Sequence, residues 1–445
     1  MEEKFADYGE VQIKQLNDRS KMYYTPNKEN NVFQLIVQYG AGEREFPKLG
    51  YAAQLMNNAG IMGAYEPQEL KEELSKLNAT CHVTADEDNL YIIMEGYEAT
   101  LPQACQLLSR QILMPKLDEK QLARLKGSAM GMRQQRKDNV SILNEALRQY
   151  MLYGEKSDYI KELTDKEIYE LQISELTGDI NRASNYEAKV FFTGTLPFDQ
   201  VYDILSKNLP LVANERPSNS PQAKEMMPVT ENTVYFLPNN DAEQAQIHLY
   251  IPMQKADKKD DVLRSAFNQY FGLDFTGIVL NEIREKRSMA YTAYAFVGTQ
   301  GIAGKASYLR GYIGTQNDKA NDALDVLMSL VNDMPKNPER IGNIKSYLRQ
   351  AMLTSHPSFR NKAMELVDLG YRGYTDDPAK ENLPKVDALT FDDIVKFYEE
   401  NIKGKPYCIS IMGNPKDIDL KRLEKFGKVV KLNERKLFNT KDALF

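Results

Sequence analysis

The chain has 445 residues, of which 42% are hydrophobic and 27% are charged, and its formal net charge is −6. This length and balance indicate a globular protein with more than one hydrophobic core. The acidic surface argues against a nucleic-acid partner, and no apolar run approaches the roughly 18 residues of a membrane-spanning helix. The three cysteines, Cys81, Cys105 and Cys408, fit neither a disulfide framework nor a Cys-x-x-Cys metal site.

The same series of predicted elements occurs twice along the chain, judged from strand-like and helix-like periodicity. In the first half the elements are a strand over 32–39, helices over 50–58 and 66–77, strands over 81–85 and 90–95, and a helix over 101–111. In the second half they are a strand over 246–252, helices over 263–269 and 276–287, strands over 290–296 and 310–314, and a helix over 319–334. A basic helix then follows a proline in each half, after Pro115 and after Pro338.

The two series also end alike. Leu163-Thr164 and Leu389-Thr390 each predict the same helix start, because the threonine can cap the helix and an acidic residue follows three positions later. Strands over 190–194 and 409–413 come next, and helices over 198–209 and 417–426 follow them. The copies therefore match from their first strand to their last helix.

A proline-containing segment, 215–231, separates the copies and predicts a linker over the surface. We place the boundary near residue 222, which gives domains over 1–222 and 223–445. Mixed strands and helices with short turns favour an α+β fold. We therefore predict two tandem homologous domains, each a mainly antiparallel sheet covered by helices.

One segment carries a family resemblance. Residues 280–295 read LNEIREKRSMAYTAYA, a predicted helix that runs into a strand. This resembles the Leu-Arg-Glu-Lys-Arg-Gly-Leu-Ala-Tyr segment of the peptidase M16 family, the insulinase/pitrilysin-like zinc peptidases, whose domains occur in pairs. Ile283 stands in place of the leucine and Ser288-Met289 in place of Gly-Leu, while Arg284 and Tyr291 are kept. The resemblance covers essentially the whole chain.

The resemblance implies a role for Arg284 and Tyr291 at the zinc of another domain. There the arginine would bind the peptide and the tyrosine would stabilise the tetrahedral intermediate in trans. Placed donors lower the barrier to peptide hydrolysis because negative charge builds on the carbonyl oxygen, and a guanidinium offers a rigid fork of donors. The plainer alternative is a solvated helix residue at Arg284 and an ordinary strand aromatic at Tyr291.

The metal-binding motif of the family is missing. Active members carry His-x-x-Glu-His on a helix, in which the two histidines bind zinc and the glutamate activates water. By alignment, Ala53, Met56 and Asn57 occupy these positions, and no acidic residue occurs over 122–137 where a further glutamate would be. The three histidines of the chain, His82, His248 and His356, lack ligand spacing, although His248 lies on a strand beside which a cleft is possible. We predict no metal in this chain and zinc in a partner half.

Two family arrangements fit these features, and we favour the C-terminal half of a long chain over a separate inactive subunit. The expected partners are a zinc-bearing M16 half or subunit and a peptide substrate. A catalytically silent M16-like scaffold is the alternative. We expect a soluble protein of bacterial type, cytoplasmic or periplasmic. The basic run over 124–137 is interpreted as a solvated helix face, and the glycine-rich run over 298–304 as a hairpin connection.

Overall fold

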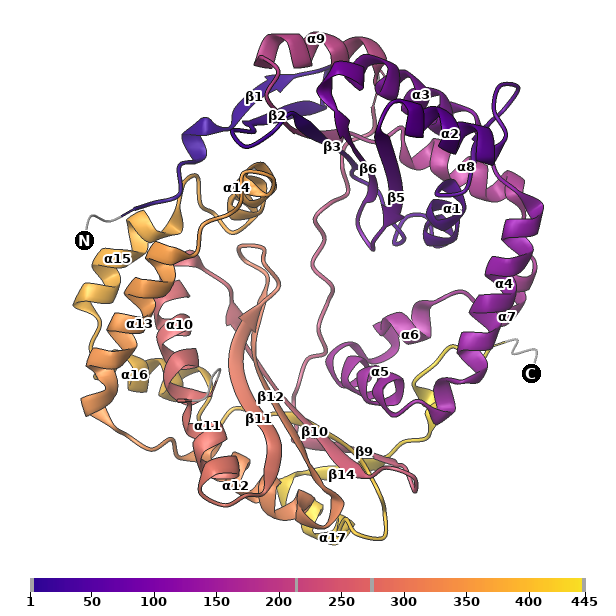
Figure 1. The fold of residues 1–445 in the computed structure, drawn as a ribbon. Coiled ribbons are helices and arrows are strands. Elements are labelled where there is room, and N and C mark those ends of the chain that lie inside the picture. Colours follow the sequence, from indigo (N-terminus) through magenta and orange to yellow (C-terminus); the bar gives the residue numbers. More distant parts are fainter. Residues whose placement is uncertain (1–3, 213–214, 273–275, 442–445) are drawn as a thin grey trace.

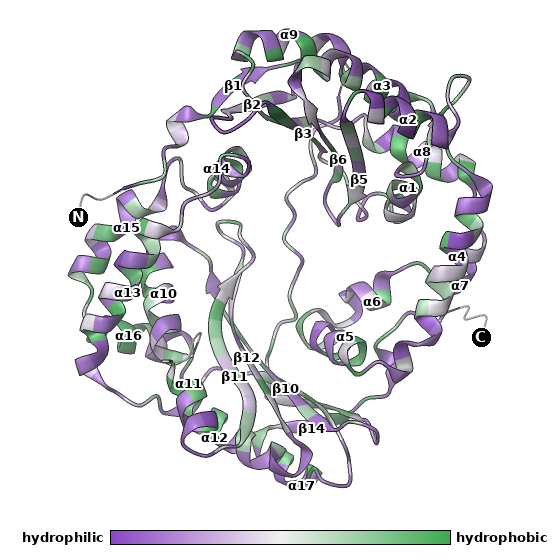
Figure 2. Cartoon of the chain, viewed as in Figure 1, coloured by the Kyte–Doolittle hydropathy of each residue, from purple (hydrophilic) through white to green (hydrophobic). Residues whose placement is uncertain are grey.

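Figure 1 shows the computed structural model of the chain, which describes residues 4–212, 215–272 and 276–441. Two layered units, each a sheet with helices on one face, lie on opposite sides of a ring (Figure 1). In Figure 2 hydrophobic residues gather on the strands and on the sheet-facing sides of the helices, and hydrophilic residues lie outside. Within the described residues, no helix is both long enough and apolar enough to cross a membrane.

The first sheet has the strand order β1-β2-β8-β3-β6-β5, and only the β2–β8 pair is parallel. The strands are β1 (Gln12–Gln15), β2 (Lys21–Pro26), β3 (Val32–Tyr39), β5 (Ala79–Ala85), β6 (Leu90–Tyr97) and β8 (Ala188–Gly194). The helices that build the core with them are α1 (Leu49–Met56), α2 (Pro67–Lys76), α3 (Leu101–Leu113), α4 (Glu119–Gln134), α8 (Ile173–Ala183) and α9 (Phe198–Asn208). A two-stranded ladder joins β4 (Gly60–Ile61) to β7 (Pro115–Lys116).

The second sheet has the order β11-β12-β10-β13-β9-β14, with β9 parallel to both β13 and β14. The strands are β9 (Thr233–Pro238), β10 (Gln244–Lys255), β11 (Ala290–Thr299), β12 (Ala306–Gln316), β13 (Cys408–Gly413) and β14 (Lys428–Lys431). The helices of its core are α10 (Asp261–Phe271), α11 (Ile278–Leu280), α12 (Ala320–Asn332), α13 (Ile341–Thr354), α15 (Pro378–Ala388), α16 (Phe391–Asn401) and α17 (Leu420–Leu423).

The two sheets repeat one topology, which confirms the predicted α+β fold with mostly antiparallel sheets. Read in opposite directions, β2-β8-β3-β6-β5 corresponds strand for strand to β9-β13-β10-β12-β11. The backbone repeats as well. Asn78 and Ser288 both have a φ of 49°, and they lie one and two residues before the edge strands β5 and β11. These are the two non-glycine residues with positive φ in the described part of the chain.

Three predicted helices differ from those observed. The helix expected over 276–287 is only α11 followed by a π-helical turn over Asn281–Glu285, because the chain turns at Ser288. The helix expected over 417–426 is observed as α17 followed by a 3-10 turn. It begins only at Leu420, because the Asp419 side chain is its N-cap. Thr164 and Thr390 both form capping boxes, but the helix that Thr164 begins is only the short α7 (Asp165–Tyr169). The helix that packs on α1 is the next one, α8, and it corresponds to α16, which packs on α10.

One helix of each half packs on the sheet of the other half. Helix α5 (Val140–Tyr153) packs its apolar side, Leu143, Ala146 and Leu147, on the second sheet against Leu237 and Met412. Helix α14 (Lys362–Tyr371) packs on the first sheet, and its Ala363 joins a cluster with Ile36 and Phe191. The domain bounds predicted from the sequence, 1–222 and 223–445, gave no sign of this exchange. The exchange means that each sheet has a core side and a side partly covered by the opposite half.

The segment over 215–231, predicted to be a surface linker, has no helix or strand apart from an isolated bridge at Arg216. It does not simply run over the outside. Its backbone bonds Asn219 to Gly40 and Met227 to Leu152, and the short helix α6 (Asp158–Lys161) supplies Asp158 to Lys224. The linker is therefore packed between the halves.

Candidate functional site

The positions that align with the metal-binding motif lie on and just after α1, and they face the core. Ala53 and Met56 are each 1% exposed and belong to the first hydrophobic core. Their burial follows from the apolar stripe of α1, which includes Leu49, Ala52 and Leu55. A metal ligand at either position would have to replace a packed apolar side chain.

Asn57, the third of these positions, caps the end of α1 and holds the neighbouring edge strand. Its amide nitrogen donates to the Val83 carbonyl at 2.9 Å, and its amide oxygen accepts from the Val83 backbone amide at 2.8 Å. One side chain thus pairs with strand β5 as a neighbouring strand would, because an amide carries both a donor and an acceptor. Sequence reasoning missed this role, since spacing alone does not place Asn57 beside β5.

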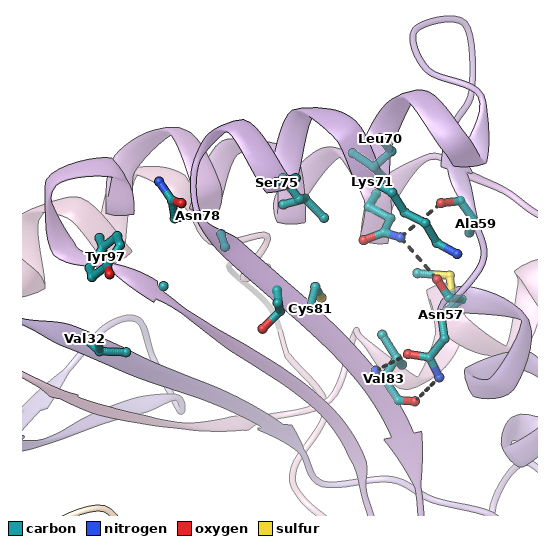
Figure 3. A pocket seen from close by; sticks show the side chains of 16 residues that line it. Val32, Asn57, Ala59, Leu70, Lys71, Ser75, Asn78, Cys81, Val83 and Tyr97 are labelled. Carbon is teal, nitrogen blue, oxygen red and sulfur yellow. Dashed lines mark hydrogen bonds between the residues drawn. The ribbon is translucent and has the colours of Figure 1, made fainter.

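A groove of about 570 Å³ lies next to this pair, between α2 and the free edge of β5 (Figure 3). Met56, Leu70 and Leu74 supply apolar lining, and Cys81 lies along the strand. The backbone of Cys81 points toward the groove because it lies two residues from Val83, whose backbone groups point away from β6 toward Asn57. Cys105 and Cys408 are buried, and all three thiols are free.

The three histidines lie at separate places in the fold. His82 and His356 are exposed, and His248 is 2% exposed beneath α5 rather than beside a cleft. The sequence signal for this burial is the apolar stripe of α5, whose residues Leu143, Ala146 and Leu147 pack on the second sheet. The described residues contain no group of three or more His, Cys, Asp or Glu side chains arranged for a metal ion. Ala53, Met56 and Asn57, which occupy the positions of the metal-binding motif, therefore do not fit a zinc ion.

The basic run over 124–137 is only partly a solvated face. Its α4 portion is mostly exposed or half-buried, but Arg133 and Arg136 at its end form ion pairs with Glu162. Arg133 also contacts Asp165 at 2.7 Å. These arginines fasten α4 to the segment that leads into α7, so they are structural cations and not a site for an anionic partner.

Arg284 and its neighbours end the π-helical turn in an αL motif, in which the residue after the turn has a left-handed backbone. The Ser288 amide donates to the Arg284 carbonyl at 2.8 Å, and the Met289 amide donates to the Ile283 carbonyl at 3.0 Å. Ser288 occupies the left-handed position that glycine usually takes in this motif. The motif turns the chain sharply from the helix into β11 and explains why the family segment has glycine there.

The charges of this segment single out one arginine. Lys286 and Arg287 both pair with Glu282, and these two cations hold the pKa of that carboxyl below its usual range. Arg284 has an exposed side chain, 43% accessible, and its nearest carboxylate is the adjacent Glu285, at 3.6 Å. Within the described residues, Arg284 is thus the cation of the segment that remains available for a ligand.

Tyr291 projects from the start of β11. Ala290 pairs with Thr315 and Thr292 pairs with Gly314, so Tyr291 is the extra residue of a β-bulge. Its side chain is 76% exposed. The Thr315 hydroxyl donates to the Met289 carbonyl and fixes the bulge from behind. The backbone therefore presents the Tyr291 phenol to solvent from a defined turn.

The structure brings Arg284 and Tyr291 to one segment but keeps them apart from α1. Both are exposed at the end of the second sheet where α11 meets β11, whereas Ala53, Met56 and Asn57 lie in the opposite half. Figure 1 shows α1 and α11 on opposite sides of the ring. The glycine-rich run over 298–304 forms the β11–β12 hairpin connection, as predicted.

Comparisons with known proteins agree with this architecture. Residues 184–345 match the family model described as Peptidase M16 inactive domain. A peptidase M16 inactive domain from Pseudomonas fluorescens superposes with a TM-score of 0.70 at 17% identity, covering 92% of this chain and 99% of that one. No curated protein matches the sequence.

Two longer proteases have the same fold in one half of their length. The periplasmic protease PqqL from Escherichia coli gives a TM-score of 0.68 at 12% identity, covering 92% of this chain and 47% of that one. The ferredoxin protease FusC, solved in complex with Arabidopsis ferredoxin, gives 0.71 at 12% identity, covering 93% and 46%. This chain therefore spans about half of each of these two proteases.

Proposed function

We propose that this chain, which belongs to the peptidase M16 family, acts as the non-catalytic half of a zinc peptidase. In this role it closes over a peptide and assists hydrolysis at a zinc ion held by a partner half or subunit. Its own α1 supplies no ligand, because Ala53 and Met56 are core residues and Asn57 is bonded to β5. Family membership and these packed positions support the non-catalytic part of the proposal.

The observation that carries the co-catalytic part is the state of Arg284 and Tyr291. Tyr291 is the most exposed of the large hydrophobic side chains in the described part of the chain, at 76%. Exposing an aromatic ring costs the free energy that burial would have gained, so an exposed tyrosine held by a β-bulge fits a surface that meets another molecule. Arg284, with Glu285 as its nearest carboxylate, has donors left for a ligand.

The chemistry of the pair suits peptide hydrolysis. Attack on a peptide carbonyl moves negative charge onto the oxygen, and a phenol hydroxyl can donate a hydrogen bond to that oxygen. The guanidinium can hold a peptide carbonyl or carboxylate with two parallel donors. In the proposal, Arg284 binds and orients the substrate while Tyr291 stabilises the transition state.

Reconstitution tests the proposal. The chain is added to its zinc-bearing partner, and cleavage of an unstructured, internally quenched peptide is followed by fluorescence. We expect the rate to rise above that of the partner alone, and zinc on this chain alone to stay well below one ion per chain. Assembly without any gain in rate would favour the scaffold alternative, and tight one-to-one zinc binding by this chain would contradict the proposal.

Substitutions separate the two residues. Tyr291→Phe should lower kcat in the assembled pair, with a loss of about 2–4 kcal/mol of transition-state stabilisation. Arg284→Ala should chiefly raise KM. Arg287→Ala is the matched control. It removes the same charge only three residues along the chain, but the Arg287 side chain is already paired with Glu282. Equal effects of Arg284→Ala and Arg287→Ala would show that only net charge matters.

A further inference from the structure

The side of the β11–β12 hairpin that faces the ring carries an aromatic surface. Side chains alternate along both strands, and the core side holds Ala293, Ala295, Val297, Leu309 and Ile313. The other side holds four aromatic residues and one cation, all half-buried: Tyr294, Phe296, Tyr308, Arg310 and Tyr312. We call these five residues the aromatic platform. Alternation at a period of two was visible in the sequence, but which side would stay uncovered was not.

The platform is continuous across the two strands. Tyr294 pairs with Tyr312 and Phe296 pairs with Arg310 in the antiparallel register. The ring centroids of Tyr294 and Tyr312 are 5.3 Å apart, and those of Tyr294 and Phe296 are 6.0 Å apart. These are separations of aromatic rings in contact.

Two glycines let tyrosine rings lie against the sheet. A Cβ atom at Gly298 would come within 3.2 Å of the Tyr308 ring, and one at Gly314 would come within 2.9 Å of the Tyr312 hydroxyl. That hydroxyl also donates to the Gln246 side chain, which holds the ring in place. The rings are thus fixed in an orientation that presents surface to a ligand rather than to the core.

Arg310 lies at the centre of this surface, and no counter-ion accompanies it in the part of the chain that the structure describes. On the sheet its neighbours are Phe296 and Tyr250 across the strands and Tyr308 and Tyr312 along its own strand. No carboxylate or other acceptor contacts its guanidinium among the described residues, and its Nε is buried without a partner. A cation that is partly withdrawn from water and unpaired is costly, so an anion at this position would be favoured.

Helix α5 covers the neighbouring strand β10 and reaches one end of the platform, where Tyr308 packs against the cluster that contains Met151 and Leu152. It buries His248 and Tyr250 on β10, which are 2% and 1% exposed, whereas the platform residues on β11 and β12 stay half-buried. In Figure 1 the ring-facing side of this hairpin has no helix over it. The platform also lies on the strand that begins with Ala290 and Tyr291, so it continues directly from the segment proposed to assist hydrolysis.

We infer that the aromatic platform binds a peptide at an aromatic side chain next to a carboxylate. The aromatic side chain would stack on Tyr294 and Phe296, and the carboxylate would take two donors from Arg310. This inference rests on the proposed function, because it names the substrate class that the same chain would hold. A carboxylate of this kind comes either from an acidic side chain or from the C-terminus of the peptide.

Binding to the full chain, without a partner or zinc, tests the inference. Fluorescence anisotropy is measured with short labelled Gly/Ser peptides that contain Phe-Asp, Phe-Asn or Ser-Asp, each with an amidated C-terminus. A fourth peptide ends in Phe with a free carboxylate, which separates the two sources. We expect the Phe-Asp peptide or the free-carboxylate peptide to bind roughly tenfold more tightly than the Phe-Asn and Ser-Asp peptides.

Arg310→Gln should remove that preference, and Phe296→Ala should weaken the preferred peptide roughly tenfold. Arg124→Gln on the exposed side of α4 is the charge-matched control and should bind as the wild type does. Equal binding of all four peptides, no binding at all, or an unchanged preference in Arg310→Gln overturns the inference. The rate effects of Arg284→Ala and Tyr291→Phe are measured separately in the assembled pair, so either idea can fail without the other.

Discussion

Lowering the pH should weaken the contact between α5 and the second sheet through one histidine. His248 is 2% exposed, its Nε2 is 2.9 Å from Asn144 Oδ1 on α5, and its Nδ1 has no partner among the described residues. Burial, together with the nearby cations Arg310 and Arg148, lowers the His248 pKa to about 3. Its other neighbours, Tyr312 and Ser410, are neutral, so no described group across the interface offsets the charge of a protonated ring.

The sign and size follow from linkage. The unfolded chain takes up a proton at His248 near pH 6.5, whereas the folded chain does not until about pH 3. Between these values the unfolded state binds more protons, so stability is complete above about pH 7 and falls as the pH decreases. At pH 5.5 the loss from this one group is about 1.4 kcal/mol, from RT ln(1 + 10) with the ordinary histidine pKa.

The assay is urea unfolding at pH 7.5 and pH 5.5, followed by far-UV circular dichroism because the chain has no tryptophan. His248→Gln is the matched variant, since the glutamine amide can still donate to Asn144 but does not titrate. The wild type should lose about 1.4 kcal/mol more than His248→Gln between the two pH values. His82 and His356 are exposed and present in both proteins, so they cancel. The same loss in both proteins would refute the reasoning.

Three further substitutions test local parts of the fold by the same urea assay. Asn57→Ala should cost about 1–3 kcal/mol, because it leaves both Val83 backbone groups without partners; a neutral result would mean that water replaces the amide. Leu147→Ala should cost about 2–5 kcal/mol, since Leu147 is fully buried between α5 and the second sheet, and a loss below 1 kcal/mol would argue against that packing. Ser288→Gly should stabilise the chain by about 0.5–1 kcal/mol, because glycine tolerates the left-handed conformation; destabilisation would contradict the assigned turn.

Much of the fold followed from the sequence because strand and helix periodicity are local signals. The repeated series of strands and helices is present in the structure, and both threonine capping boxes form as expected. Local signals fail where the end of a helix depends on a turn. The segment at Asn281–Glu285 has helix-forming residues, yet the left-handed Ser288 and its backbone bond to Arg284 set where the helix stops.

The sequence proposes which residues form the candidate site, but it does not show the environment of each side chain. Spacing and resemblance picked out Arg284 and Tyr291, and the structure adds that Lys286 and Arg287 are paired while Tyr291 sits in a bulge. The role of Asn57 depends on β5, which lies beyond the reach of any helical spacing. Contacts between distant segments decide these environments, and a single sequence does not display them.

The exchange of α5 and α14 bears on how the chain would close over a peptide. Separating its two halves would expose Leu143 and Leu147 at one interface and Ala363 with Phe191 at the other, at a cost proportional to the apolar area uncovered. The chain is therefore held at two separate helix-on-sheet contacts, which resist both hinge opening and sliding. If the proposed function holds, we expect closure to be a movement of this whole chain against its zinc-bearing partner, with Arg284 and Tyr291 carried on a rigid sheet.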